Sequence, residues 1–154
     1  MRKWLKWIGA ALLVGFAAIQ FTTPARTNPP VVPGHDAMAS NPPPAEIATL
    51  FKNACYDCHS YETTWPWYSY IAPVSWTVIQ DVNDAREAMN FSDWPNDDPF
   101  HSRKRWRRVA EAIDANEMPI PKYTLIHRKS RLNPQQRKEL INWAEQTADK
   151  LEDQ

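Results

Sequence analysis

Both cysteines of this chain of 154 residues stand in one pentapeptide, Cys55-Tyr56-Asp57-Cys58-His59. A C-x-x-C-H sequence has the spacing of c-type haem attachment. One helical turn can present both thiols to the vinyl groups at one edge of the porphyrin, and the following residue then offers a neutral imidazole to the iron. The motif therefore predicts one covalently attached haem, with Cys55 and Cys58 as attachment sites and His59 as the proximal ligand.

Other roles for this pentapeptide fit less well. A thiol–disulfide exchange motif belongs in a βαβ pattern, which the sequence does not have. A structural zinc ion needs four ligands, and the remaining histidines, His35, His101 and His127, are scattered along the chain. A disulfide that closes so small a loop would add little stability. A zinc or redox site and purely structural cysteines remain as alternatives to haem.

The composition fits one globular domain behind a leader. Eight tryptophans need large flat apolar surfaces, provided by one another or by a flat cofactor. The chain has 18 basic and 18 acidic side chains, and residues 1–21 hold three of the basic ones and none of the acidic ones. The remaining body is therefore mildly acidic, which gives no support for nucleic-acid binding.

Residues 1–21 are typical of an export signal. Arg2, Lys3 and Lys6 precede an apolar run over residues 8–21. Flanking tryptophans can lengthen this run at the membrane interface, and no clean small-x-small cleavage site follows it, so an anchor is favoured over a cleaved signal peptide. The positive charge orients the N-terminus inward. We expect the body on the periplasmic side of the cytoplasmic membrane, where c-type haem is attached.

Residues 22–44 contain seven prolines. Prolines block helix and ladder hydrogen bonds and favour extended backbone. This segment is therefore predicted to be a linker, either a semi-rigid stalk or a disordered tether, between the anchor and a haem-binding domain over residues 45–154.

Four stretches of the body have apolar residues at helical spacing: 45–59, 74–90, 102–116 and 134–151. Ser102 and Asn133 are the expected N-caps of the last two helices. The expected buried faces are Ile47, Leu50, Phe51 and Ala54; Val78, Val82, Ala85 and Met89; Trp106, Val109, Ala110 and Ile113; and Leu140, Ala144, Thr147 and Leu151. The predicted fold is all-α: a small helical domain around one haem, with an N-terminal apolar anchor.

An aromatic segment over residues 60–73 follows His59 directly and is predicted to be a loop, because Pro66 and Pro73 interrupt it. Its rings could cover one face of the haem or close the ordinary core. The carbonyl of Pro66 or Pro73 is a candidate acceptor for the second ring N–H of His59.

The sixth position on the iron is predicted to be filled by Met118, a thioether that suits haem iron. Met118 lies in the sequence Glu117-Met118-Pro119-Ile120-Pro121, and a proline-bounded loop can hold it with little entropy left to lose. The alternatives are Met38, Met89, His101 and His127. Met89 fits the buried face of a helix, so the core is its natural place.

Five of the six residues over 103–108 are basic. They could pair with haem propionates or dock an acidic partner. A solvated helix face is the more ordinary interpretation, because exposed charge is the common case.

The strings Asp57-Cys58-His59-Ser60, Thr64-Trp65-Pro66-Trp67-Tyr68-Ser69 and Ile71-Ala72-Pro73-Val74-Ser75-Trp76 resemble the small bacterial haem-binding domain family with a C-x-x-C-H site. Met118-Pro119 and the helix after Leu132-Asn133-Pro134 are similar to that family and, more loosely, to class I cytochromes c. The resemblance covers about residues 26–148. It implies an all-α, c-type cytochrome-like haem domain. In that domain Cys55 and Cys58 are the attachment sites, His59 is the proximal ligand and Met118 is the distal ligand.

The expected function is single-electron transfer to a redox protein partner through a haem ligated by His59 and Met118. The sequence identifies no spare acid–base group near the haem, which favours an electron carrier over an enzyme. Two alternatives stay open. One is a haem-based sensor or peroxidase-like enzyme with an open sixth site, and the other is a non-catalytic haem module of a larger complex.

Overall fold

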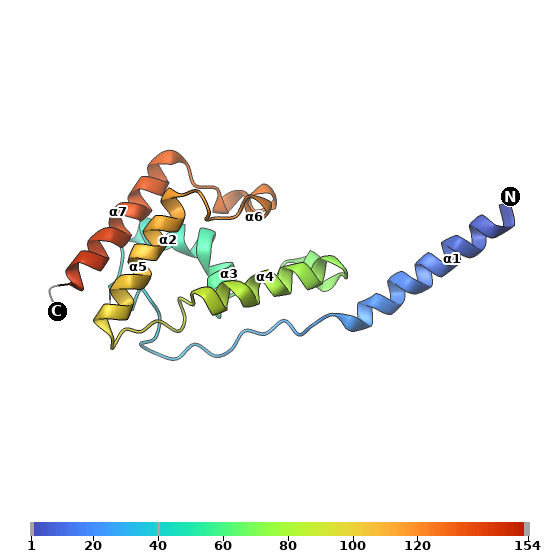
Figure 1. Ribbon diagram of the computed structural model, residues 1–154, viewed down its shortest axis with the longest axis horizontal. Coiled ribbons are helices and arrows are strands. Elements are labelled where there is room, and N and C mark those ends of the chain that lie inside the picture. The colour runs from blue at the N-terminus through green and yellow to red at the C-terminus, as the bar shows by residue number, and fades with distance from the viewer. Residues whose placement is uncertain (1, 40, 153–154) are drawn as a thin grey trace.

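The computed structural model describes residues 2–39 and 41–152, which contain helices and irregular segments and no strand (Figure 1). The prediction of an all-α fold is therefore confirmed. The 3-10 turns are η1 (Gln20–Thr22), η3 (Trp67–Tyr70) and η4 (Arg128–Ser130), and η2 (Lys52–Tyr56) is a π-helical turn. The α-helices are α1 (Arg2–Ile19), α2 (Ala45–Phe51), α3 (Asp57–His59), α4 (Val74–Ala88), α5 (Pro99–Asp114), α6 (Pro121–Ile126) and α7 (Pro134–Lys150).

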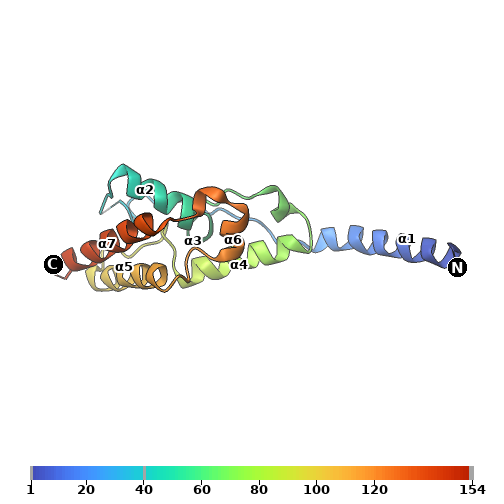
Figure 2. The same cartoon turned by 90° about the horizontal axis from the view of Figure 1, so that it is seen from above.

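Helix α1 extends away from the rest of the molecule, as Figures 1 and 2 show. Residues Lys3–Thr22 are long and apolar enough to cross a membrane, with a mean hydropathy of 1.5, and none of their most apolar stretch is buried. A membrane anchor and a signal sequence both have these properties.

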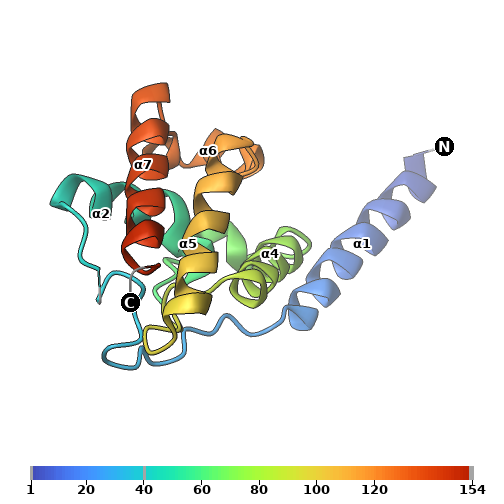
Figure 3. The ribbon, with the colours of Figure 1, turned by 60° about the vertical axis from the view of Figure 1, so that its left-hand side comes forward.

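Helices α5 and α7 lie along each other and form the centre of the core, and α2 packs across them (Figure 3). Trp106 of α5 is fully buried, and its ring centroid lies 5.8 Å from Phe51 of α2 and 4.8 Å from Trp143 of α7. The faces predicted for these three helices are the buried ones, except that Leu50 and Leu151 are only half-buried. Their 3.6-residue periodicity was therefore a sound guide to the core.

One helix start agrees with the sequence and one does not. Asn133 caps α7 as predicted, because its Oδ1 accepts the backbone N–H of Gln136 at 2.8 Å and the Gln136 side chain accepts the N–H of Asn133 at 3.0 Å. Helix α5 begins at Pro99 instead of Ser102, because Asp98 is its N-cap. The predicted cap Ser102 is buried inside the first turns of α5.

Helix α4 is rotated from its predicted orientation. It buries Ile79 and Val82, whereas Val78, expected on that face, is half-buried and lines a surface hollow. Helix α6 was not predicted. Two prolines around Ile120 suggested extended backbone only, but Pro121 takes the first helical position, where its missing N–H costs nothing.

The proline-rich segment has no α-helix over the described residues 22–39 and 41–44, as expected, and it lies against the body. Ala37 is fully buried, and its N–H donates to the carbonyl of Phe91 at 2.8 Å. The Tyr56 hydroxyl donates to Asp36 at 3.0 Å. Asn28 donates to the carbonyl of Thr63 at 2.8 Å. These long-range hydrogen bonds make the segment part of the folded unit.

Candidate functional site

The helical run over residues 45–59 contains a π-helical turn just before its end. Helix α2 passes into η2, which holds Cys55, and then into the short helix α3, which holds Cys58 and His59. The run ends at Ser60, whose backbone is extended and whose buried hydroxyl donates to the carbonyl of Tyr56 at 2.7 Å. A π turn widens the helix locally and is frequent at functional sites. Both thiols and the imidazole therefore come from one short, capped stretch.

The imidazole of His59 is held by the C-terminal end of α4. Its Nδ1 lies 2.9 Å from the carbonyl oxygen of Ala85 and 3.0 Å from that of Met89. A carbonyl oxygen can only accept hydrogen bonds, and that of Ala85 accepts the backbone N–H of Met89 at 2.9 Å as well. Nδ1 therefore carries the proton, and Nε2 keeps its lone pair. The predicted acceptors, the carbonyls of Pro66 and Pro73, were wrong.

Two further contacts fix His59. Its backbone carbonyl accepts the N–H of Phe91 at 2.7 Å, and its ring meets the Phe91 ring edge-on with centroids 6.2 Å apart. Burial lowers the pKa of His59, although its hydrogen bonds to Met89 and Ala85 work in the opposite direction. The side chain is therefore a neutral, oriented imidazole at neutral pH, which is the form that binds metals.

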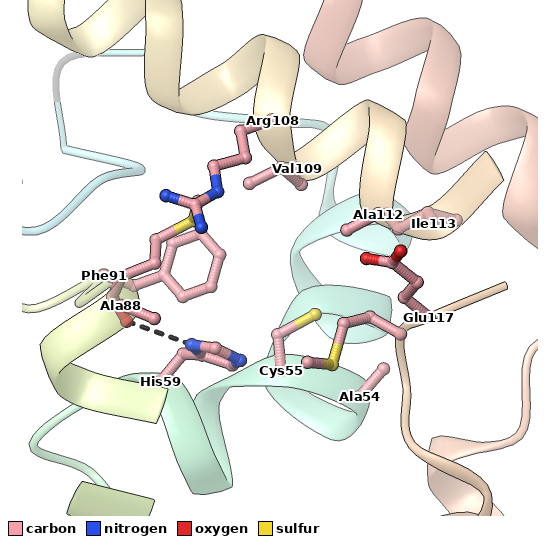
Figure 4. A pocket seen from close by; sticks show the side chains of 12 residues that line it. Ala54, Cys55, His59, Ala88, Phe91, Arg108, Val109, Ala112, Ile113 and Glu117 are labelled. Atoms are coloured by element: carbon pink, nitrogen blue, oxygen red, sulfur yellow. Dashed lines mark hydrogen bonds between the residues drawn. The ribbon is translucent and has the colours of Figure 1, made fainter. Parts of the chain in front are cut away.

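His59 faces a cleft with two connected parts. The two parts share Ala54, His59, Ala88 and Met118, have cavity volumes of about 140 Å³ and 310 Å³, and are open to solvent. Cys55 lines the first part and Cys58 the second. Figure 4 shows the free ring nitrogen of His59 on the side of Cys55.

Met118 enters this cleft from the turn after α5. Its backbone N–H donates to the carbonyl of Ala112 at 3.1 Å, and its own carbonyl accepts Nη1 of Arg137 at 3.1 Å. The same Arg137 atom donates to the carbonyl of Ile113 at 3.1 Å. Helix α7 thus clamps the turn that positions Met118, a role that the sequence pattern did not reveal.

Of the other candidates for an iron ligand, His101, His127 and Met38 lie outside this cleft. His101 is exposed and its Nδ1 lies 2.6 Å from Asp98, and His127 bonds the Tyr68 hydroxyl at 2.6 Å. Met38 packs partly buried against the core. Met89 lines the first part of the cleft and packs against the core, as its sequence position suggested. Among the candidates, Met118 alone lines both parts of the cleft together with His59.

The family model for the haem-binding domain matches residues 14–146 of the chain. The chain belongs to this haem-binding domain family. It therefore binds haem, which fits an apolar cleft next to a neutral imidazole. No curated protein and no solved structure matched the chain.

The residues of the cleft suit a haem in their chemistry as well as in their placement. Apolar side chains form most of the wall of its first part, and these include Phe91, Val109 and Ile113. Burial raises the pKa of the Cys55 thiol to about 12 and that of the Cys58 thiol to about 11, the latter with a contribution from the charge of Asp57. Both sulfurs are thus protonated and uncharged beside an apolar cofactor site.

The zinc and redox alternatives fit this haem-binding domain poorly. A cysteine active in thiol–disulfide exchange has a lowered pKa, whereas both pKa values here are raised. Within residues 2–39 and 41–152, no group of three His, Cys, Asp or Glu side chains could hold a metal ion.

Two charged side chains reach the first part of the cleft from α5 and the turn after it. Arg108 and Glu117 both line it, and they lie on different sides of it in the view of Figure 4. Within the basic stretch 103–108, Arg103 and Arg107 form ion pairs with Glu152 beyond α7. Arg103 and Arg107 therefore link α5 to the end of α7, whereas Arg108 of the same stretch points toward the cleft.

A chain of polar contacts runs from Tyr123, which lines the second part of the cleft. The Tyr123 hydroxyl donates to Asp57 at 2.6 Å, the Tyr123 ring stacks on His127 with centroids 4.2 Å apart, and His127 bonds Tyr68. This chain ties the haem motif to α6 and to the aromatic segment. In that segment, Trp67 is exposed instead of closing the core. With Tyr68, it lines a further hollow that Cys58 also borders.

Proposed function

We propose that this haem-binding domain is a membrane-tethered c-type haem protein that transfers single electrons on the periplasmic side of the cytoplasmic membrane. The carrying observation is the geometry of His59. Its Nδ1 is committed to two backbone carbonyls, and its Nε2 is left for a metal in a cleft lined by both cysteines and Met118. The single apolar helix at the N-terminus favours the tether.

The residues of the cleft have separate roles in this proposal. Cys55 and Cys58 would hold the haem through thioether bonds, and His59 and Met118 would be its proximal and distal ligands. Bound in this way, haem supplies a one-electron iron couple. The apolar walls exclude water, and the clamp of Arg137 on the Met118 turn limits motion of the distal side. Arg108 is placed to offset the charge of a propionate.

A peroxidase-like enzyme is the second candidate, because one observation favours it. The sequence identified no acid–base group beside the haem, but the structure brings the exposed carboxylate of Glu117 to the wall of the cleft. A carboxylate there could move a proton to or from a small molecule bound at an open sixth position. A sensor would also need that open position.

Covalent attachment is tested on the full chain, expressed with the c-type maturation machinery and purified from membranes in mild detergent. Acid–acetone extraction should leave the haem on the protein. Cys55→Ser and Cys58→Ser should each reduce the haem that survives denaturation, and the double variant should have none. Complete extraction of haem from the matured wild-type protein would refute c-type attachment.

The Met118→Ala variant separates the carrier from the enzyme. A carrier ligated by His59 and Met118 should be low-spin in the wild type and become high-spin in the variant, with rapid carbon monoxide binding. Met89→Ala is the matched control, because Met89 also lines the cleft. A wild-type protein that is already high-spin and binds carbon monoxide rapidly would favour the enzyme or sensor.

A further inference from the structure

An aromatic patch lies on the surface where the anchor helix meets the body. It is built by η3 and the start of α4, and its side chains are well exposed: 75% for Trp67, 55% for Tyr70, 40% for Ile71, 49% for Val74 and 37% for Trp76. Residues 63–80, which contain the patch, have no Asp, Glu, Lys or Arg. Exposed apolar patches of this kind mark surfaces that contact a partner or a membrane.

The patch is joined directly to the end of the anchor. The side-chain amide of Gln20 donates to the carbonyl of Ala72 at 3.2 Å, and its oxygen accepts the N–H of Ala72 at 2.9 Å. The hydroxyl oxygens of Thr23 and Ser75 lie 3.4 Å apart. Figures 1 and 2 show the start of α4 beside the end of α1 in both directions of view. These contacts therefore hold the last turn of the anchor and the aromatic patch side by side, at the same position along the axis of α1.

We propose that this aromatic patch lies in the headgroup region of the membrane that α1 crosses, so that the body rests on the bilayer. The inference depends on the proposed tether, because α1 brings the patch to the lipid surface. Trp and Tyr are enriched at that depth because their rings are apolar and their tips are polar. Phe21, 91% exposed, ends the anchor at the same place.

The charges at the edge of the patch fit a lipid surface. The guanidinium of Arg26 lies 3.9 Å from the centre of the Tyr70 ring, and its Nη1 donates to the carbonyl of Ser69 at 3.0 Å. A cation held at this level is attracted to anionic headgroups. The guanidinium of Arg26 could also bind an acidic protein partner. The uncharged aromatic surface beside it, however, favours contact with lipid over contact with an acidic protein.

The test uses the full chain in vesicles of phosphatidylethanolamine and phosphatidylglycerol. The photoreactive residue benzoylphenylalanine replaces Leu12, Tyr70 or Phe100, one at a time. Leu12 lies in the anchor, and Phe100, 61% exposed, belongs to the first turn of α5. Helix α5 lies at the end of the body away from α1 (Figure 1). After illumination, mass spectrometry reports whether each position gains the mass of one phospholipid.

The proposal expects a phospholipid adduct at position 12 and at position 70. It expects no phospholipid adduct at position 100. An adduct at position 12 without one at position 70 would overturn the lipid contact and leave the tether standing. Adducts at neither position would refute the tether and the lipid contact together. A cross-link from position 70 to a second copy or to another protein would overturn the proposal in favour of a protein partner.

Discussion

The hydrogen bond between Tyr123 and Asp57 gives a sharp test of how the haem motif is held. The Tyr123 hydroxyl donates to Oδ2 of Asp57 at 2.6 Å, across 66 positions of sequence. The other oxygen of Asp57 accepts the backbone N–H of Thr64 at 3.0 Å. The carboxylate thus joins α3 to α6 on one side and to the aromatic segment on the other.

The Tyr123→Phe variant removes only the hydroxyl and keeps the ring that stacks on His127. A hydrogen bond to a charged group contributes about 1.5–3 kcal/mol to stability. Both side chains are half-buried, so water can hydrate the carboxylate that is left, and the lower end of this range applies. We expect the free energy of unfolding to fall by about 1.5 kcal/mol.

Urea unfolding of the full chain in mild detergent, followed by circular dichroism, measures this loss. With a slope of roughly 2 kcal/mol per M, the midpoint should move by about 0.7 M. The matched control Tyr70→Phe removes an exposed hydroxyl and should change stability by less than about 0.5 kcal/mol. Asp57→Asn keeps an oxygen for Thr64 and completes a double-mutant cycle.

The cycle decides the interpretation. If the hydrogen bond is the cause, the interaction free energy between the two substitutions should be about 1 kcal/mol or more. The first substitution already removes the hydrogen bond, so the second cannot remove it again. Additive effects of Tyr123→Phe and Asp57→Asn, or a Tyr123→Phe variant as stable as Tyr70→Phe, would refute the reasoning.

Three further predictions concern other parts of the fold. Asn133→Ala should lower the free energy of unfolding by about 1 kcal/mol by removing the cap of α7, whereas Gln135→Ala on the same turn should have little effect in the same urea titration. Arg137→Met should loosen the Met118 turn and lower the low-spin fraction in the optical spectrum, because it deletes both bonds to the carbonyls of Ile113 and Met118; Lys138→Met on the exposed face should leave the spectrum unchanged. The free energy of unfolding should fall as the pH rises above about 10, the ordinary pKa of tyrosine. Burial raises the pKa of Tyr123 and of Tyr56 in the folded chain. Above pH 10 the unfolded chain therefore releases protons that the folded chain retains, and this favours unfolding. Tyr123→Phe should show a shallower alkaline loss in urea midpoints measured across that range, and an equal loss in both proteins would contradict this assignment.

Periodicity predicted the parts of the fold that depend on one helix at a time. Trp106, Val109, Ala110 and Ile113 lie on one face of α5 by spacing alone, and that face is buried. The start of α5 was misplaced because Asp98 and Ser102 are both good caps. Pro99 fits the first turn that follows Asp98, so the earlier start prevails.

Features that depend on contacts between distant segments were beyond the sequence. The carbonyls that hold His59 belong to the end of α4, and any residue type could supply them, so no side-chain signal marked Ala85 or Met89. The same holds for Arg137, whose guanidinium binds backbone oxygens only. The C-x-x-C-H motif could be located in the sequence because its chemistry needs particular side chains, whereas its supports could not.

Helix α4 connects the two regions that matter most for the proposed function. Its 15 residues span about 22 Å at 1.5 Å per residue. The residues just before its start are bonded to the anchor through Gln20, and the carbonyls at its end hold the imidazole of His59. If α1 is the membrane tether that we propose, a helix, and not the proline-rich segment, sets the height of the haem site above the membrane. We then expect a redox partner to present its own cofactor near the bilayer surface, because the site would not swing outward on a long tether.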